Sequence, residues 1–175
     1  MSEENVDSAI RAWLLSRPVQ DGPGGGGEGR GRFAGWDEWG AAAADIPEYE
    51  PRLAAALRED PDPVLRAAAA QAIGRLGLNS ASGRLVEALS LDLPFVASEA
   101  ASALGSLGAA TAIGPLCAAM RHADANVRGS AATALGTLGG ERAIQCLRDA
   151  RNDEDALVRA AADEGLRRLE SKDAG

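Results

Sequence analysis

The feature that most constrains this chain is a repeat of 31 residues. Four sets of positions recur at that spacing: Ile73, Leu104, Leu135 and Leu166; Leu65, Val96, Val127 and Val158; Ala69, Ala100, Ala131 and Ala162; and the pairs Gly74/Gly77, Gly105/Gly108 and Gly136/Gly139. A fixed period of this size is typical of stacked units of secondary structure, each of which covers its apolar face with a neighbour. The repeat therefore predicts an elongated array.

Within one copy, the apolar residues Val127, Ala131, Leu135 and Leu138 lie on one stripe of a helix. Glycines then end that helix, since glycine accepts the left-handed backbone that closes it, and a second, shorter helix follows. We expect first helices at about 63–76, 94–107 and 125–138, and second helices at about 80–90, 111–122 and 141–151. The predicted fold class is all-α, an alpha-alpha superhelix of antiparallel helix pairs.

Three segments carry a resemblance to a known family. The segments DPVLRAAAAQAIGRLG, DANVRGSAATALGTLG and DALVRAAADEGLRRL resemble the short HEAT repeats of the phycobilisome-lyase type. The resemblance covers about residues 60–169 and implies a HEAT-like solenoid. As a function, it implies a bilin lyase-like or chaperone activity on a tetrapyrrole-bearing protein.

The rest of the chain divides into segments around the array. Residues 1–16 are predicted to form an amphipathic helix that includes Trp13, and the glycine-dense residues 17–33 a flexible linker. Residues 34–60 are expected to form a degenerate capping helix pair, and residues 61–170 the repeat array. Because the last copy has polar residues where earlier copies have alanine, we expect the array to stop near Leu169, with a disordered tail at 171–175.

Composition excludes several classes of function. The formal net charge of −8 argues against nucleic-acid binding, which needs clustered cations. No apolar run reaches the roughly 20 residues that span a bilayer, so we expect no membrane segment. Cys117 and Cys146 lie on successive second helices whose axes should be about 8–10 Å apart. We therefore expect free thiols and a cytoplasmic protein.

The start of each first helix repeats an aspartate and an arginine, as Asp62/Arg66, Asp124/Arg128 and Asp155/Arg159. The acid favours the helix amino terminus, and we expect the arginine to reach an acid of the adjacent unit, which would form a ladder. The second unit has Leu93 and Ala97 at these two positions, beside Leu91, Pro94 and Phe95. This apolar cluster is interpreted in three ways: a docking point for another chain, a seat for the chain's own amino-terminal helix, or part of the core.

Solenoids of this kind recruit ligands on the inner surface, which we expect the second helices to line. The candidate side chains there form a mixed-charge strip with an arginine bias, suited to a partner that carries carboxylates. They are Arg84, Glu87, Arg121, His122, Gln145, Arg148 and Asp149. A solvated face is the alternative for each of them.

Catalytic groups are sparse. His122 is the only histidine, so recurring histidine ligands for a metal are absent, and we predict no metal and no cofactor. A Cys146 nucleophile with His122 as its base is the one catalytic pair considered, against an exposed, inert cysteine.

The sequence therefore predicts a non-enzymatic adaptor that binds a protein or peptide on the inner face of a helical solenoid. The candidate binding residues are Trp13, Arg84, Glu87, Leu93, Phe95, Arg121 and Arg148. Self-association through the amino-terminal helix, with Trp13 filling the groove of another copy, is a further hypothesis.

Overall fold

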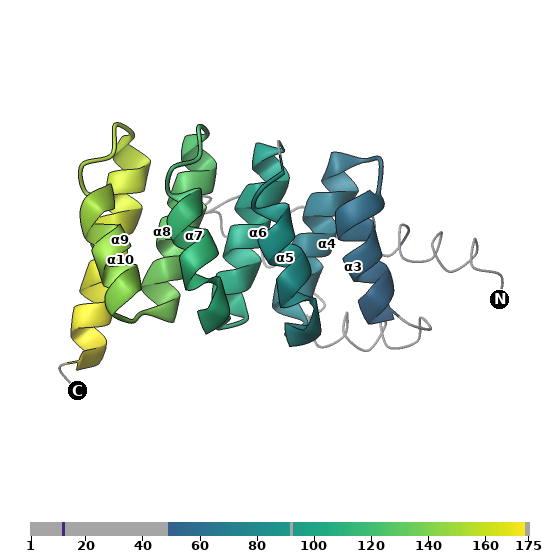
Figure 1. Ribbon diagram of the computed structural model, residues 1–175, viewed down its shortest axis with the longest axis horizontal. Helices are drawn as coiled ribbons and strands as arrows, with labels where there is room; N and C mark the ends of the chain where they lie inside the picture. The colour runs from purple at the N-terminus through teal and green to yellow at the C-terminus, as the bar shows by residue number, and fades with distance from the viewer. Residues whose placement is uncertain (1–11, 13–48, 92, 174–175) are drawn as a thin grey trace, which may run out of the picture.

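The computed structural model describes residue 12, residues 49–91 and residues 93–173. Helices follow one another along the whole described array (Figure 1). They are α3 (Tyr49–Glu59), α4 (Pro63–Arg75), η1 (Asn79–Ala81), α5 (Ser82–Ala88), α6 (Pro94–Ser106), η2 (Ala110–Ala112), α7 (Ile113–Ala119), α8 (Ala125–Leu138), α9 (Glu141–Ala150) and α10 (Ala156–Asp173). The described residues contain no strand, and the predicted all-α superhelix is confirmed.

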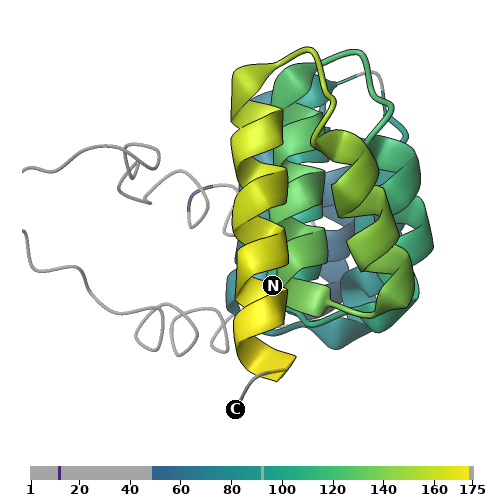
Figure 2. The ribbon, with the colours of Figure 1, turned by 90° about the vertical axis from the view of Figure 1, so that its left-hand side faces the viewer.

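The helices form two layers, which the end-on view separates (Figure 2). The first helices α4, α6, α8 and α10 pack side by side in one layer. The second helices α5, α7 and α9 lie in the other layer, where α3 packs against both α4 and α5. Each pair therefore needs its neighbour to cover it, as the repeat predicts.

The apolar stripe of each first helix is the core. Leu104 and Leu135 are fully buried, and so are the residues of the second register, Val96, Val127 and Val158. Burial of one such side chain contributes about 1.5–3 kcal/mol to stability, so the repeated register supplies much of the folding free energy. Leu166 is half-buried, because α10 is the last described helix and no further unit covers it.

Successive first helices approach closely through small residues. A Cβ on Gly74 would lie 2.7 Å from the Cα of Ala103, and a Cβ on Gly105 would lie 2.9 Å from the Cα of Ala134. A Cβ on Gly136 would lie 2.5 Å from the Cα of Gly165. The first glycine of each repeated pair therefore sets the spacing between first helices.

The second glycine of each pair ends its helix. Gly77, Gly108 and Gly139 have φ angles of 69°, 66° and 73°, in the left-handed region that glycine occupies without a steric penalty. The chain then turns into η1 before α5, into η2 before α7, and through Gly140 directly into α9. The α-helical parts of α5 and α7 are thus shorter than the predicted ranges.

The predictions for the two ends of the array can be compared with the structure only in part. Leu53 and Leu57 of α3 are buried against the first unit, as predicted for the second half of the cap. Apart from residue 12, the predicted amino-terminal helix, the linker and residues 34–48 lie outside the described residues, and Trp13 lies outside them too. At the other end, α10 continues to Asp173, so the prediction that residues after Leu169 fray is wrong as far as 173.

The extension of α10 has a local cause. Residues 166–173 contain leucine, arginine, glutamate and lysine, which favour helix, and the Ser171 hydroxyl donates to the Arg168 carbonyl oxygen at 2.8 Å. Among the described helices, none has both the length and the apolar content that crossing a membrane requires.

Candidate functional site

A hollow of about 450 Å³ opens between the second helices α7 and α9. This volume lies within the range of about 300–1,000 Å³ that ligand pockets have. We call it the α7/α9 pocket. Its lining comes from both helices and from the turns that follow them: Gly114, Cys117, Ala118, Met120, Arg121, Arg142, Cys146, Asp149, Ala150, Asn152 and Asp153.

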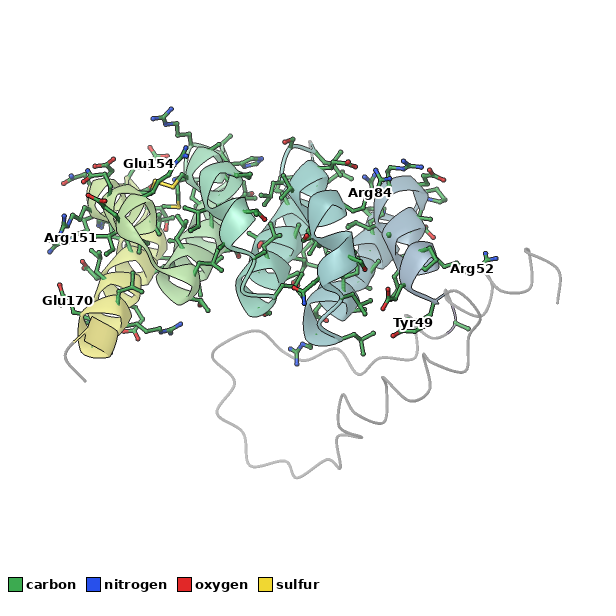
Figure 3. All side chains as sticks on the ribbon, turned by 60° about the horizontal axis from the view of Figure 1, so that its bottom comes forward. Tyr49, Arg52, Arg84, Arg151, Glu154 and Glu170 are labelled. Carbon is green, nitrogen blue, oxygen red and sulfur yellow. A yellow bond between two sulfur atoms is a disulfide. The ribbon has the colours of Figure 1, made fainter. Side chains whose placement is uncertain are left out.

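A disulfide bond joins Cys117 and Cys146 in this pocket, and Figure 3 draws its sulfur atoms in yellow. The two Cα atoms are 5.8 Å apart, which is in the usual range for a disulfide. The predicted free thiols are therefore wrong. The expected axis spacing of about 8–10 Å does not prevent a bond between side chains that face each other.

The spacing of the cysteines contained the signal for this bond. They are 29 residues apart, two fewer than the repeat, so the residue in register with Cys117 is Arg148. Two residues turn about 200° around a helix, so Cys146 lies on nearly the opposite side of α9 from Arg148. One cysteine thus faces forward along the array, and the other faces back toward it.

The Cys117–Cys146 disulfide also bears on the catalytic pair considered above, Cys146 with His122. Both cysteines of the chain are bonded, so Cys146 is neither the nucleophile considered above nor the exposed, inert thiol weighed against it. The ring nitrogen Nδ1 of His122 accepts a hydrogen bond from the backbone N–H of Asp124 at 2.9 Å. His122 therefore orders the turn before α8. Among the described residues, no group of three histidine, cysteine or acidic side chains is placed to hold a metal ion.

Arg142 crosses the pocket from α9 to α7. Its carbon Cζ and both terminal nitrogens would lie 3.6 Å from a Cβ placed on Gly114, so the planar guanidinium lies over that glycine. The bonded sulfur of Cys117 lies 3.9 Å from the Arg142 carbonyl oxygen. Arg142 is exposed, and its guanidinium pairs with no acid among the described residues.

Arg121 lies at the other end of the pocket, directly after the residue that caps α7. A cation near a helix carboxyl terminus is favourable, and this is the structural role of Arg121. Within the described chain its guanidinium has no acidic partner either. The pocket therefore holds two arginines whose charge no described side chain neutralises.

The acids of the pocket are already engaged. The Asp153 carboxylate accepts two hydrogen bonds from Arg128, from Nε and Nη2, each 2.9 Å long. Asp149 accepts from the side-chain amide of Gln145 at 3.0 Å. Neither carboxylate pairs with Arg121 or Arg142.

Arg128 is the centre of the predicted ladder. It is 6 % exposed and joins its own unit to the next through Asp153. The hydrogen bonds from Arg128 lower the pKa of Asp153, against the opposing effect of burial, and the same bonds raise the pKa of Arg128. Both groups therefore stay charged near neutral pH.

The remaining members of the ladder behave differently. Asp62, Asp124 and Asp155 accept from backbone N–H groups two residues on, at 2.9, 2.8 and 2.8 Å, as the predicted helix caps. Arg159 donates to the carbonyl oxygens of Asp153 and Glu154, and Arg66 donates to that of Leu57. The predicted link from an arginine to an acid of the adjacent unit is thus confirmed for Arg128, whereas Arg66 reaches a backbone carbonyl of α3.

In the second unit, where Leu93 and Ala97 replace the aspartate and the arginine, part of the apolar cluster packs against the core. Leu91 and Leu93 are half-buried and pack against it, and Leu93 stands at the amino-terminal cap of α6 without a side-chain cap bond. Phe95 is 57 % exposed. Val64 and Leu157, in the same register, are 58 % and 76 % exposed, and Asn126 is the polar fourth member.

The other predicted strip residues lie along the second helices. Arg84 and Glu87 pair with each other across one turn of α5 at 2.9 Å (Arg84 is labelled in Figure 3). Arg148 is exposed on α9, and its side chain makes no ion pair with a described residue. The structure thus places Arg121 in the pocket and leaves Arg84 and Glu87 outside it. Sequence reasoning missed Arg142, because nothing in its spacing indicates that it lies over Gly114.

Two family models match the array. One, described as HEAT repeats, matches residues 84–167, and one described as HEAT repeat matches residues 51–80. No curated protein matches the chain.

Solved structures with the same architecture are known. The crystal structure of an engineered protein has a TM-score of 0.62 at 24 % identity, over 77 % of this chain and 69 % of that one. The complex of CpcE and CpcF of phycocyanin lyase from Nostoc sp. PCC7120 has a TM-score of 0.60 at 21 % identity, over 90 % of this chain and 72 % of that one. At these identities the likeness shows the fold alone.

Proposed function

Because the chain is a HEAT-repeat protein, we propose that it is a non-enzymatic scaffold that binds a protein or peptide partner on the layer of its second helices. The observation that carries the proposal is the difference between the two layers. First helices touch through glycine and alanine, whereas α7 and α9 leave the α7/α9 pocket between them. Successive first helices are therefore in close contact, whereas the second helices α7 and α9 offer a hollow between them.

The charges of the second-helix layer support a protein partner. Arg121, Arg142 and Arg148 are exposed there, while the buried core of the array consists of leucine, valine, isoleucine and alanine. These arginines are not needed to hold the units together. Exposed cations that project from a rigid helical surface are suited to charge-assisted hydrogen bonds with a partner.

Site-specific photo-crosslinking tests the proposed face. A photoreactive phenylalanine analogue at Gln145 on α9, or at Glu87 on α5, places the reactive group on the second-helix layer, since both side chains are exposed. Matched positions on the first helices are Thr133 of α8 and Ser102 of α6, which are also exposed. The expected result is one crosslinked partner band from Gln145 and Glu87 in an extract of the source cells.

The control positions on the first helices show which layer of the array contacts the partner. A band obtained from Thr133 and Ser102 but not from Gln145 and Glu87 contradicts the proposal, because the partner would then lie on the first helices. Equal bands from all four positions contradict it as well, since they indicate unspecific contact.

The bilin lyase-like or chaperone alternative requires an accessible thiol or a pair of acids in an apolar groove. The chain has two cysteines, and both are in the disulfide. The acids of the α7/α9 pocket are bonded to Arg128 and Gln145. An absorbance change of a bilin on addition of the protein would favour this alternative over the scaffold.

Two further predictions accompany the proposal. Self-association through residues 1–16 concerns a segment outside the described residues, and light scattering of the intact chain and of a variant without residues 1–33 tests it. A cytoplasmic location stays a prediction, now without the support of free thiols, because disulfides persist mainly in oxidising compartments.

A further inference from the structure

We infer that the α7/α9 pocket binds an extended acidic peptide segment, with Arg142 and Arg121 each holding one carboxylate. The inference rests on the proposed scaffold function and specifies its ligand. It starts from two guanidinium groups that line one pocket of about 450 Å³ and that no described acid neutralises.

The position of Arg142 has no explanation in the stability of its own helix. It lies in the first turn of α9, where the helix dipole disfavours a cation, and only the neighbouring Glu141 offsets this. Its guanidinium nevertheless lies over Gly114 of α7, where its atoms would be in ordinary van der Waals contact with a Cβ, at 3.6 Å. The exposed guanidinium has no acidic partner among the described residues, and a planar group of this kind can bind a carboxylate through two parallel hydrogen bonds.

The two arginines mark opposite ends of the pocket. Arg142 contacts Gly114 in the first turn of α7, and Arg121 follows the end of that helix, which has 7 residues. At 1.5 Å per residue, the ends are about 10 Å apart. One carboxylate cannot serve both arginines at that distance unless their side chains fold inward.

An extended peptide matches this spacing. A polyproline II chain rises about 3.1 Å per residue with three residues per turn, so side chains at positions i and i+3 lie on one side, about 9 Å apart. The side chain of Asn152, in the same wall, can both donate to and accept from the peptide backbone. Two glutamates separated by two residues therefore span the pocket.

The overall charge of the chain argues against a phosphate backbone as the ligand. Asp149 and Asp153 line the same pocket, and the chain carries a formal net charge of −8. Two arginines can each hold one of two separated carboxylates, whereas binding of a phosphate backbone needs many clustered cations, which a chain of this net charge does not favour. The favoured ligand is thus an acidic peptide, and nucleic acid is the alternative that the experiment tests.

Fluorescence anisotropy of a labelled peptide measures the interaction with the full-length, oxidised chain. The probe contains Glu-Pro-Pro-Glu, and its uncharged control contains Gln-Pro-Pro-Gln. Arg121→Gln and Arg142→Gln are each expected to weaken binding of the acidic probe about tenfold or more, since each removes charge-assisted hydrogen bonds. The matched control is Arg167→Gln on α10, which makes the same change of charge outside the pocket and is expected to leave the affinity within twofold.

Four outcomes would overturn the inference: no binding of the acidic probe, equal binding of the uncharged probe, equal weakening by Arg167→Gln, or equal competition by a short single-stranded DNA. Melting temperatures of the variants within the error of the wild type show that a lost affinity is not unfolding. The crosslinks from Gln145 and Glu87 do not depend on the chemistry of the probe. If they persist while the acidic probe fails, the scaffold function stands and the acidic ligand is wrong.

Discussion

Arg128 is the one charged residue that is buried among the described part of the chain. Its guanidinium donates to Asp153 of the next unit and to the carbonyl oxygens of His122 and Ala123 in its own unit. Arg66 cannot make the equivalent link, because Leu91 occupies the position that corresponds to Asp153. Among the described residues, Arg128 thus makes the one link from a buried arginine to an acid of the next unit.

Replacement of Arg128 by alanine is expected to lower the free energy of unfolding by about 3–5 kcal/mol, because it leaves the half-buried Asp153 carboxylate without its partner. Urea denaturation of the wild type and the variant measures the difference. The double variant Arg128→Ala, Asp153→Ala should lose less than the sum of the two single variants, since they share one interaction. Strict additivity would show that the ion pair contributes nothing.

Acid should remove the contribution of Asp153. The pKa of this carboxyl is lower in the folded chain than the value of about 3.9 expected in the unfolded chain. Its stabilising effect is therefore complete above about pH 5, declines as the pH falls through the unfolded value, and is lost below the lowered folded value. The gap in melting temperature between the wild type and Asp153→Asn should be constant from pH 7 to about pH 5 and shrink at lower pH. A gap that widens in acid would contradict this.

At the scale of the helices, the two glycines of each repeated pair have different structural roles: the first allows close packing and the second ends the helix. Gly136 lets α8 approach α10, whereas Gly139 supplies the left-handed backbone after α8. The register of Gly74, Gly105 and Gly136 is therefore a packing requirement.

The substitution Gly136→Ala is expected to destabilise the array by about 1–3 kcal/mol, because the new Cβ would meet the Cα of Gly165 at 2.5 Å. Gly129→Ala in the same helix is the matched control. A Cβ there meets nothing within 4 Å, so alanine should raise stability by about 0.5–1 kcal/mol through helix propensity. If the two variants have the same midpoint of urea denaturation, the first helices are not in the close contact described here.

The helices themselves were accessible to sequence reasoning, because each stripe repeats and the copies support one another. Leu104 and Leu135 have equivalent buried positions, as a common register predicts. Local effects were not accessible. The 3-10 turns before α5 and α7, Asn79–Ala81 and Ala110–Ala112, lie 31 residues apart and so follow the repeat, but no apolar stripe marks them in the sequence. The continuation of α10 to Asp173 belongs to the last copy alone and has no counterpart in the repeat.

At the scale of the whole molecule, the first helices pack closely on one another, and the disulfide joins α7 to α9 in the layer of second helices. The period predicts which helices are neighbours, but it does not state how far apart second helices lie. The bond between Cys117 and Cys146, and the position of Arg142 over Gly114, follow from the angular position of each side chain. For that reason, only Arg121 of the three arginines in the expected strip lines the observed pocket.

Removal of the disulfide by Cys117→Ser, Cys146→Ser is expected to cost about 3 kcal/mol, since the bond closes a loop across a separation of 29 residues. Differential scanning fluorimetry of the oxidised wild type with and without dithiothreitol should show the same loss. Alkylation followed by mass spectrometry counts the free thiols in each sample. If the reduced wild type has the same melting temperature as the oxidised protein, the disulfide does not stabilise the fold.

The central claim is that the second helices form the surface that holds a partner. Amide hydrogen exchange of the chain, alone and in complex with the protein that it captures, measures this directly. The account predicts added protection in α7 and α9 and little change in α6 and α8. Added protection confined to α6 and α8, with α7 and α9 unchanged, would contradict it.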